Sequence, residues 1–241
     1  MTTAVATDLE AHLAQSPACL ARHATDDEIA AALAEMVAHR DYPCLGARSV
    51  FRRDAAEIAV LPNMAADDLV ATLGERLRTF AAEHGDSEDL VSFIAVFRDP
   101  VAGSEREFET SLWRVLQELH DRDDTPWPGD VASDPSDPRF AFAFSGTPYF
   151  IVGLHPAASR IARRAPLPTM VFNLHRQFER LRSDGTFARM RTAIRRREER
   201  LQGSVNPMMD DYGSSSAARQ YSGRAVEIDW RAPFAPRGAR G

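Results

Sequence analysis

The sequence predicts an α+β fold, a central and mainly antiparallel sheet packed with helices. Apolar residues recur at helical spacing in several long segments, and short β-branched and aromatic runs lie between them. Neighbouring strand candidates look antiparallel, and no strand–helix unit repeats along the 241 residues. Because no low-complexity linker divides the chain, we expect a single domain over residues 25–231, a loosely ordered segment at 1–24 and a flexible tail at 232–241.

Helices and short strands are predicted in the N-terminal half. Residues 26–40 place apolar side chains at helical spacing, with acids at the start and bases at the end, which favours an amphipathic helix. A second helix is predicted over residues 65–82 by the same spacing. Residues 50–51 and 58–60 are short strand candidates, and LVSFIAVF at 90–97 is typical of a buried strand.

A third helix is predicted over residues 104–120, because Ser104 and Glu107 have the spacing of a capping box and one apolar face follows. The acidic, proline-rich loop at 121–138 comes next, and loops of this length often cover a site. The remaining predicted elements are a hairpin of residues 140–144 and 149–154, a strand at 169–172, and helices at 175–182 and 186–202.

Composition excludes several classes of protein. No apolar run reaches 18 residues and no secretory signal is recognisable, so we expect a cytoplasmic protein without a membrane span. Two cysteines, Cys19 and Cys44, cannot form a disulfide framework or a four-cysteine zinc site. All 29 basic residues are arginines, which excludes Schiff-base lysine chemistry and a phosphate-loop lysine. Cys44 is open to two interpretations, a thiolate ligand or nucleophile and a small buried thiol.

Charge is unevenly distributed. Between His155 and Arg231 there are 15 arginines and eight acids, whereas the whole chain carries a formal charge of −6. This basic third could hold an anionic cofactor, pair with the acidic N-terminal part or bind nucleic acid. Aromatic residues are not interleaved with the arginines as a base-stacking surface requires, so nucleic-acid binding is disfavoured.

Two histidines occupy predicted strand ends. His155 follows YFIVGL and precedes a proline, which keeps its backbone extended, and His175 follows TMVFN and begins a helix. The two imidazoles could share one site, or each could be an ordinary core or capping histidine. Four further residues follow His155 closely: Ser159, Arg160, Arg163 and Arg164.

These arginines suit carboxylates, because a planar guanidinium binds a carboxylate through two parallel hydrogen bonds. Haem carries two carboxylates and an iron that an imidazole can bind, so arginines close to a histidine suit it. Solvated charges on a short helix explain the same arginines equally well. A later segment, residues 201–224, gathers further polar groups and is either a binding surface or a flexible connection. Its candidate binding residues are Asn206, Arg219, Gln220, Tyr221 and Arg224.

Several segments together resemble the YqcI/YcgG family over roughly residues 40–234. They are YPCLGARS, FETSLWRVLQELHDRD, GLHPAASRIARR, PTMVFNLHRQFERLR, LQGSVNPMMDDYG, ARQYSGR and WRAPF. The resemblance implies a haem-dependent monooxygenase that uses O₂ and an external electron donor to N-hydroxylate a guanidino group, of arginine or of a related small nitrogenous substrate. It also implies haem b as the cofactor, and a homodimer is one interpretation of it.

The resemblance assigns roles to the candidate residues. His155 is the first choice as the axial ligand to iron and His175 the second. Cofactor binding would involve Ser159, Arg160, Arg163, Arg164 and Arg224, and the substrate side would involve Asn206, Arg219, Gln220 and Tyr221. A guanidinium substrate needs a carboxylate partner, for which Glu179, Asp210 and Asp211 are candidates.

Two positions depart from the family pattern. Ala217 stands where relatives commonly have an acid, which leaves the substrate open, and Ala232 stands where they commonly have cysteine, which argues against an axial thiolate there. Two other functions are alternatives. One is a non-catalytic haem-binding protein with both histidines on iron, and the other is an anion- or nucleic-acid-binding module.

Overall fold

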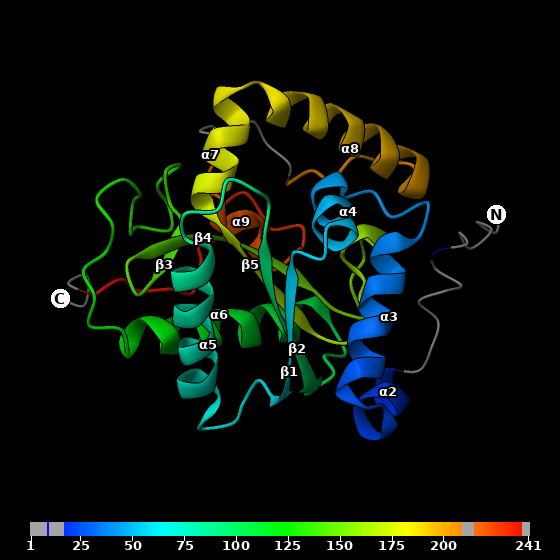
Figure 1. The fold of residues 1–241 in the computed structure, drawn as a ribbon, viewed down its shortest axis with the longest axis horizontal. Coiled ribbons are helices and arrows are strands. Elements are labelled where there is room, and N and C mark those ends of the chain that lie inside the picture. The colour runs from blue at the N-terminus through cyan, green and yellow to red at the C-terminus, as the bar shows by residue number, and fades with distance from the viewer. Residues whose placement is uncertain (1–8, 10–16, 209–214, 238–241) are drawn as a thin grey trace.

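A five-stranded mixed sheet forms the centre of the protein in a computed structural model, which describes residues 9, 17–208 and 215–237 (Figure 1). The strands follow the order β1-β2-β5-β4-β3. Only the β1–β2 pair is parallel; the other three pairs are antiparallel, which confirms the predicted α+β class. The strands are β1 (Ala56–Asn63), β2 (Ser92–Asp99), β3 (Phe142–Phe144), β4 (Thr147–Leu154) and β5 (Thr169–Leu174).

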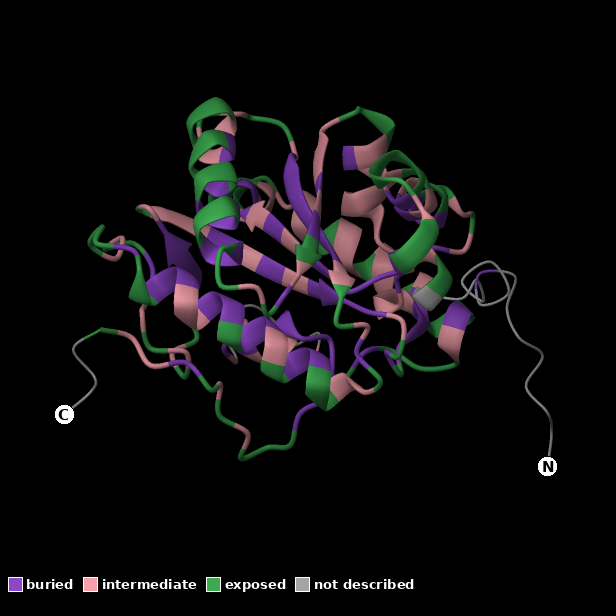
Figure 2. Cartoon of the chain, turned by 90° about the horizontal axis from the view of Figure 1, so that it is seen from below, coloured by how far each residue is buried: buried purple, intermediate pink, exposed green. Residues whose placement is uncertain are grey.

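Helices cover both faces of the sheet. On one face lie α5 (Leu69–His84), α6 (Glu105–Asp121) and the short α9 (Ala218–Tyr221). The opposite face is covered by α2 (Pro17–His23), α3 (Asp26–Ala38), α4 (Leu45–Arg52) and α8 (Thr186–Gln202), while α7 (His175–Ser183) leads from β5 into α8 (Figure 1). Figure 2 shows that the strands between these layers are mostly buried, while the helices turn exposed faces to solvent.

The two faces have separate apolar cores, because side chains alternate along a strand. In β4, Tyr149 and Ile151 pack toward α5 and α6 and are fully buried. Val152 and Leu154 point to the other face. Phe150 lines the cavity on that face and also packs against the first core, where its ring centroid lies 5.8 Å from that of Tyr221. This alternation decides which candidate residues can meet.

The predicted helices and the hairpin are present, but residues 50–51 are not a strand. They belong to α4, where Cys44 is the N-cap residue and its Sγ accepts a hydrogen bond from the Ala47 N–H at 3.5 Å. Two β-branched or aromatic residues are too few to display a period, so helix and strand could not be distinguished there. The capping at α6 is also simpler than predicted: Ser104 accepts from the Glu107 N–H, but the Glu107 carboxylate accepts from the Gly103 N–H instead of from Ser104.

The ends of the chain are partly packed. Helix α2 lies within the segment that we expected to be loosely ordered. Of residues 1–16, Leu9 is the one that the structure describes. In the expected C-terminal tail, Phe234 is buried and its ring centroid lies 6.2 Å from that of Trp113. Among the residues that the structure describes, no helix is long and apolar enough to cross a bilayer.

Candidate functional site

A cavity of about 270 Å³ lies between the sheet and helices α3, α4, α7 and α8. Its volume is close to the lower end of the range for small-molecule sites. Most of its walls are apolar: β2, β4 and β5 contribute Ile94, Phe150, Val152, Leu154 and Val171, and the helices contribute Leu33, Val37, Val50, Phe51, Phe178, Phe187, Met190 and Ile194. Such walls exclude water and bind apolar surface.

One end of the cavity, at the start of α7, has a polar lining. The Ser92 hydroxyl donates to Asn173 Oδ1 at 2.7 Å, and Asn173 Nδ2 donates to the Phe150 carbonyl at 3.1 Å. His175 and Gln177 complete this lining. These four residues come from β2, β5 and α7. They meet because β5 pairs antiparallel with β2, which places Asn173 opposite Ser92, and α7 follows β5 directly.

The other end of the cavity contains ionised groups. Arg163 donates to the Gly153 carbonyl at 3.2 Å, and burial lowers the pKa of its guanidinium, an effect that the nearby Glu198 opposes. Glu198 is buried and accepts a hydrogen bond from the Asn206 N–H at 3.2 Å. Arg160 reaches to 3.7 Å from Glu198 Oε2, so it contributes charge to the carboxylate without a hydrogen bond.

Cys44 also lines this end, and burial raises the pKa of its thiol. A raised pKa disfavours the thiolate, which is the form that binds metal or attacks a substrate. The contact between Sγ and the Ala47 N–H is a helix-capping contact. These observations favour a neutral, partly buried thiol that caps α4 over the ligand or nucleophile.

Cations exceed anions in the cavity wall. Among the described lining residues, Arg163, Arg182 and Arg191 are basic, and Glu198 is the acidic one. Arg182 also donates to the Glu179 carboxylate. A wall with this charge balance favours an anionic ligand over a cationic one.

Of the two alternatives for His155 and His175, the structure favours separate surroundings over a shared site. β4 and β5 are antiparallel, with Leu154 opposite Thr169 and Tyr149 opposite Leu174. The two histidines therefore follow opposite ends of this strand pair, about 17 Å apart along the strands. They also differ in surroundings, because His175 lines the cavity and His155 packs against α6 on the other face.

His155 is enclosed by apolar side chains. Its ring stacks on Phe108 with 4.6 Å between centroids, the residue is 1% exposed, and its Nδ1 has no hydrogen-bond partner in the part of the chain that the structure describes. Burial lowers the pKa of this imidazole to about 4, against a smaller opposing effect of Glu105. His155 is thus a neutral core residue in this structure and does not belong to the cavity lining.

His175 is the imidazole of the cavity. Its Nε2 lies 3.2 Å from Glu179 Oε1, one helical turn further along α7. Burial lowers the pKa of His175, although Glu179 opposes that change, so the ring is neutral near pH 7. A neutral imidazole with one nitrogen held by a carboxylate is the usual state of a metal-binding histidine.

Of the other candidate residues, Asn206 and Gln220 line the cavity together with Arg163 and His175, whereas the rest lie outside it. Ser159 donates to Glu105 through both N–H and hydroxyl, and Arg164 donates to the Ala158 carbonyl. Arg160 donates to the Ser204 hydroxyl and carbonyl. These groups stabilise the loop that follows β4.

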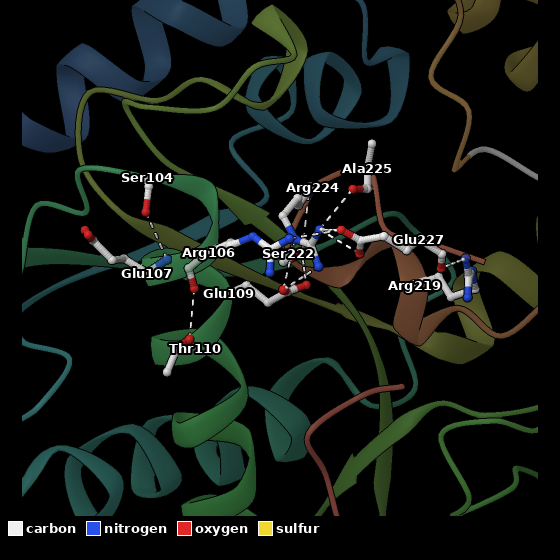
Figure 3. Close-up of polar contacts among 10 residues, drawn as sticks. All are labelled: Ser104, Arg106, Glu107, Glu109, Thr110, Arg219, Ser222, Arg224, Ala225 and Glu227. Atoms are coloured by element: carbon white, nitrogen blue, oxygen red, sulfur yellow. Dashed lines mark hydrogen bonds and ion pairs between the residues drawn. The ribbon is translucent and has the colours of Figure 1, made fainter. Parts of the chain in front are cut away.

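The remaining three candidates hold the segment around α9 in place. The Tyr221 hydroxyl accepts from the Phe142 N–H at 3.1 Å, and Arg219 donates to the Glu227 carbonyl. Arg224 donates to Glu109 Oε2 at 3.0 Å and to Glu227, and the Ser222 hydroxyl donates to Glu109 Oε1 at 3.1 Å (Figure 3). This buried ion pair joins α6 to the segment that carries Gln220 into the cavity wall.

The candidate carboxylates differ as well. Asp210 and Asp211 lie outside the described residues. Glu179 is exposed at the surface and already contacts His175 and Arg182. Glu198, which the sequence analysis missed, is the buried carboxylate of the wall. Its signal was available, because Glu198 follows Ile194 by four residues and precedes Leu201 by three on the apolar side of its helix.

Comparisons with known proteins give one family. The YqcI/YcgG family model matches residues 33–235. The uncharacterized protein YcgG of Bacillus subtilis (strain 168) is 30% identical over 183 residues, covering 71% of each chain. The uncharacterized protein YqcI of the same strain is 26% identical over 179 residues, covering 71% of this chain and 70% of the relative.

A third relative has a functional name. The "Putative N(omega)-hydroxy-L-arginine synthase DcsA" of Streptomyces lavendulae is 28% identical over 212 residues, covering 82% of this chain and 79% of the relative. No solved structure matches the chain.

Proposed function

Because the chain belongs to the YqcI/YcgG family, we propose that it is a haem-dependent monooxygenase that N-hydroxylates a guanidino group, of arginine or of a related small nitrogenous substrate. The observation that carries the proposal is its similarity, over most of both chains, to a relative named as an N-hydroxy-arginine synthase. The cavity described above is the proposed place of the reaction.

The residue types of the cavity lining suit haem, but at about 270 Å³ the cavity is smaller than a porphyrin, so the walls would have to move apart to admit it. A porphyrin needs apolar walls, its carboxylates need cations, and its iron needs a neutral donor such as imidazole. The cavity combines apolar walls with more arginines than acids, and His175 lies in its lining with one nitrogen held by Glu179. In the proposal His175, and not His155, is therefore the iron ligand.

Each of these residues has a defined part. His175 would bind iron, Glu179 would orient the ring and raise its basicity, and Arg163, Arg182 and Arg191 would bind the carboxylates. When bound, haem would supply oxygen activation with electrons from an external donor. The apolar walls would keep bulk water away from the reacting nitrogen.

Glu198 is the proposed partner of the guanidinium group. Its carboxylate is buried in the cavity wall. Among the described residues that line the cavity, Glu198 is the one with a carboxylate. The Asn206 N–H occupies only part of its acceptor capacity, since a carboxylate accepts about four hydrogen bonds. A guanidinium binds such a group through two parallel N–H donors, which would present one nitrogen in a fixed position.

The visible spectrum of the purified protein tests the cofactor. Hemin added to the full chain should produce a Soret band that titrates to saturation, and His175→Ala should change the ferrous spectrum while His155→Ala should retain it. A chain that gives no Soret band with hemin contradicts the proposal. A spectrum that His155→Ala alters and His175→Ala does not contradicts the ligand assignment.

Arginine binding tests the role of Glu198. Glu198→Gln keeps an acceptor for the Asn206 N–H but removes the charge, so we expect arginine to bind about tenfold or more weakly, measured by calorimetry. The matched control is Glu199→Gln, at the exposed next position of α8, which should leave arginine binding unchanged. Equal affinities in wild type and Glu198→Gln would remove Glu198 from the proposal.

A further inference from the structure

The first turn of α7 lines the cavity without a side-chain cap. Leu174 occupies the N-cap position and makes no side-chain hydrogen bond to the helix. The first N–H groups of a helix have no partner within it, and together with the helix dipole they favour an anion. His175 and Gln177, both in this turn, belong to the cavity lining.

Gln177 adds an independent observation. Its side chain is 5% exposed, and its Oε1 accepts a hydrogen bond from the Val91 N–H at 3.2 Å. That contact identifies the other amide atom as the NH₂ group, a donor. Nε2 is buried and has no hydrogen-bond partner among the described residues, which is unfavourable unless a ligand supplies an acceptor.

The neighbouring groups do not supply that acceptor. Ser92 and Asn173 bond to each other, and Asn173 donates onward to the Phe150 carbonyl. His175 Nε2 faces Glu179, and Arg176 points to the surface, where it binds Asp86. Gln177 itself belongs to the cavity lining, and no described residue supplies an acceptor for its Nε2.

We propose that the first turn of α7 and the Gln177 amide form a carboxylate-binding subsite of the cavity. The inference rests on the proposed function for the identity of the ligand, because an amino-acid substrate and a haem propionate both carry this group. In either case a carboxylate oxygen would accept from Nε2 and from the N–H groups of the turn.

Two variants test the subsite in the full chain. Gln177→Glu retains an acceptor for the Val91 N–H and replaces the donor by an acceptor, so it should repel a carboxylate. Gln177→Met removes the donor without adding charge, and it serves if the glutamate variant unfolds. The matched control is Gln117→Glu on α6, whose amide binds the Ala235 backbone away from the cavity.

Paired ligands distinguish the two sources of the carboxylate. Calorimetry compares arginine with agmatine, its decarboxylated form, and absorbance titration compares hemin with hemin dimethyl ester. If the substrate carboxylate binds here, both Gln177 variants should lower the affinity for arginine about tenfold to hundredfold and the affinity for agmatine less than twofold. If a propionate binds here, the affinity for hemin should fall to that extent, and the affinity for its dimethyl ester should not.

Norleucine, which has the carboxylate but no guanidino group, separates this inference from the proposed function. Norleucine binding that weakens in both Gln177 variants, in a protein that does not hydroxylate arginine, would support the subsite and reject the proposed function. The subsite is rejected if folded Gln177 variants bind arginine, norleucine and hemin with wild-type affinity. It is also rejected if none of the three ligands binds the wild-type chain.

Discussion

His155 illustrates how a single residue's role depends on the face of the sheet that it occupies. Its position after a strand and before a proline suggested an iron ligand, and in the structure the same position places the ring against Phe108. Side chains alternate between the faces of a strand, so a shift of one residue would have directed it to the cavity. The sequence predicts the strand end but not which face the cavity occupies.

Stability should depend on pH through His155. Its pKa is about 4 in the folded protein and about 6.5 when unfolded, so below pH 6.5 the unfolded chain binds a proton that the folded chain does not. The free energy of unfolding should therefore fall as pH decreases from 6.5 to 4, by up to about 3 kcal/mol from this residue.

Urea unfolding at several pH values measures this dependence. His155→Phe keeps an aromatic ring against Phe108 and removes the titration, so its free energy of unfolding should fall less than that of wild type between pH 6.5 and 4. Parallel pH profiles for the two proteins would show that His155 is not held neutral by the fold.

At the scale of elements, the Arg224–Glu109 pair connects α6 to the segment after α9. Both side chains are nearly buried, at 8% and 10% exposure (Figure 3). The Ser222 hydroxyl donates to Glu109, and Arg224 also donates to Glu227. From the sequence we assigned Arg224 to the cofactor, because an arginine in a polar loop is equally suited to a ligand and to an internal carboxylate. The pairing depends on a contact between residues 115 positions apart, which no local pattern displays.

Removing this arginine should destabilise the protein strongly. Arg224→Ala leaves the buried Glu109 without its cation, and we expect a loss of about 3–5 kcal/mol in the free energy of unfolding. Arg106→Ala is the control, because Arg106 binds the same Glu227 at 3.0 Å but its side chain is 75% exposed. The control should cost less than about 1 kcal/mol. Equal losses in thermal or urea unfolding would contradict the difference in burial.

For the whole molecule, the sheet divides a packed core from a core that contains the cavity. The α+β class, the helices and the hairpin followed from periodicity and turn residues, which are local signals. The cavity residues Gln177, Asn173, Ser92 and Glu198 were missed, since they lie on two strands and two helices that meet only after folding. His175, Arg163, Asn206 and Gln220 were predicted as binding residues, and the structure brings them to the same cavity.

Substitutions on the two faces of β4 should therefore have different effects. Val152→Phe fills part of the cavity and should weaken binding of hemin or arginine by tenfold or more. Ile151→Val, one residue away and fully buried against α5 and α6, should cost about 0.5–1.5 kcal/mol of stability and leave binding unchanged. Calorimetry and urea unfolding on both variants measure the two effects. Weaker binding in Ile151→Val with normal binding in Val152→Phe would place the ligand on the other face.

Mass spectrometry of arginine after incubation with the hemin-loaded protein, O₂ and a reductant tests the central claim most directly. We expect arginine to gain one oxygen atom on its guanidino group with the wild-type chain, and this product to be lost in His175→Ala and reduced in Glu198→Gln. A wild-type protein that binds haem but oxygenates neither arginine nor any related guanidine compound would contradict the account.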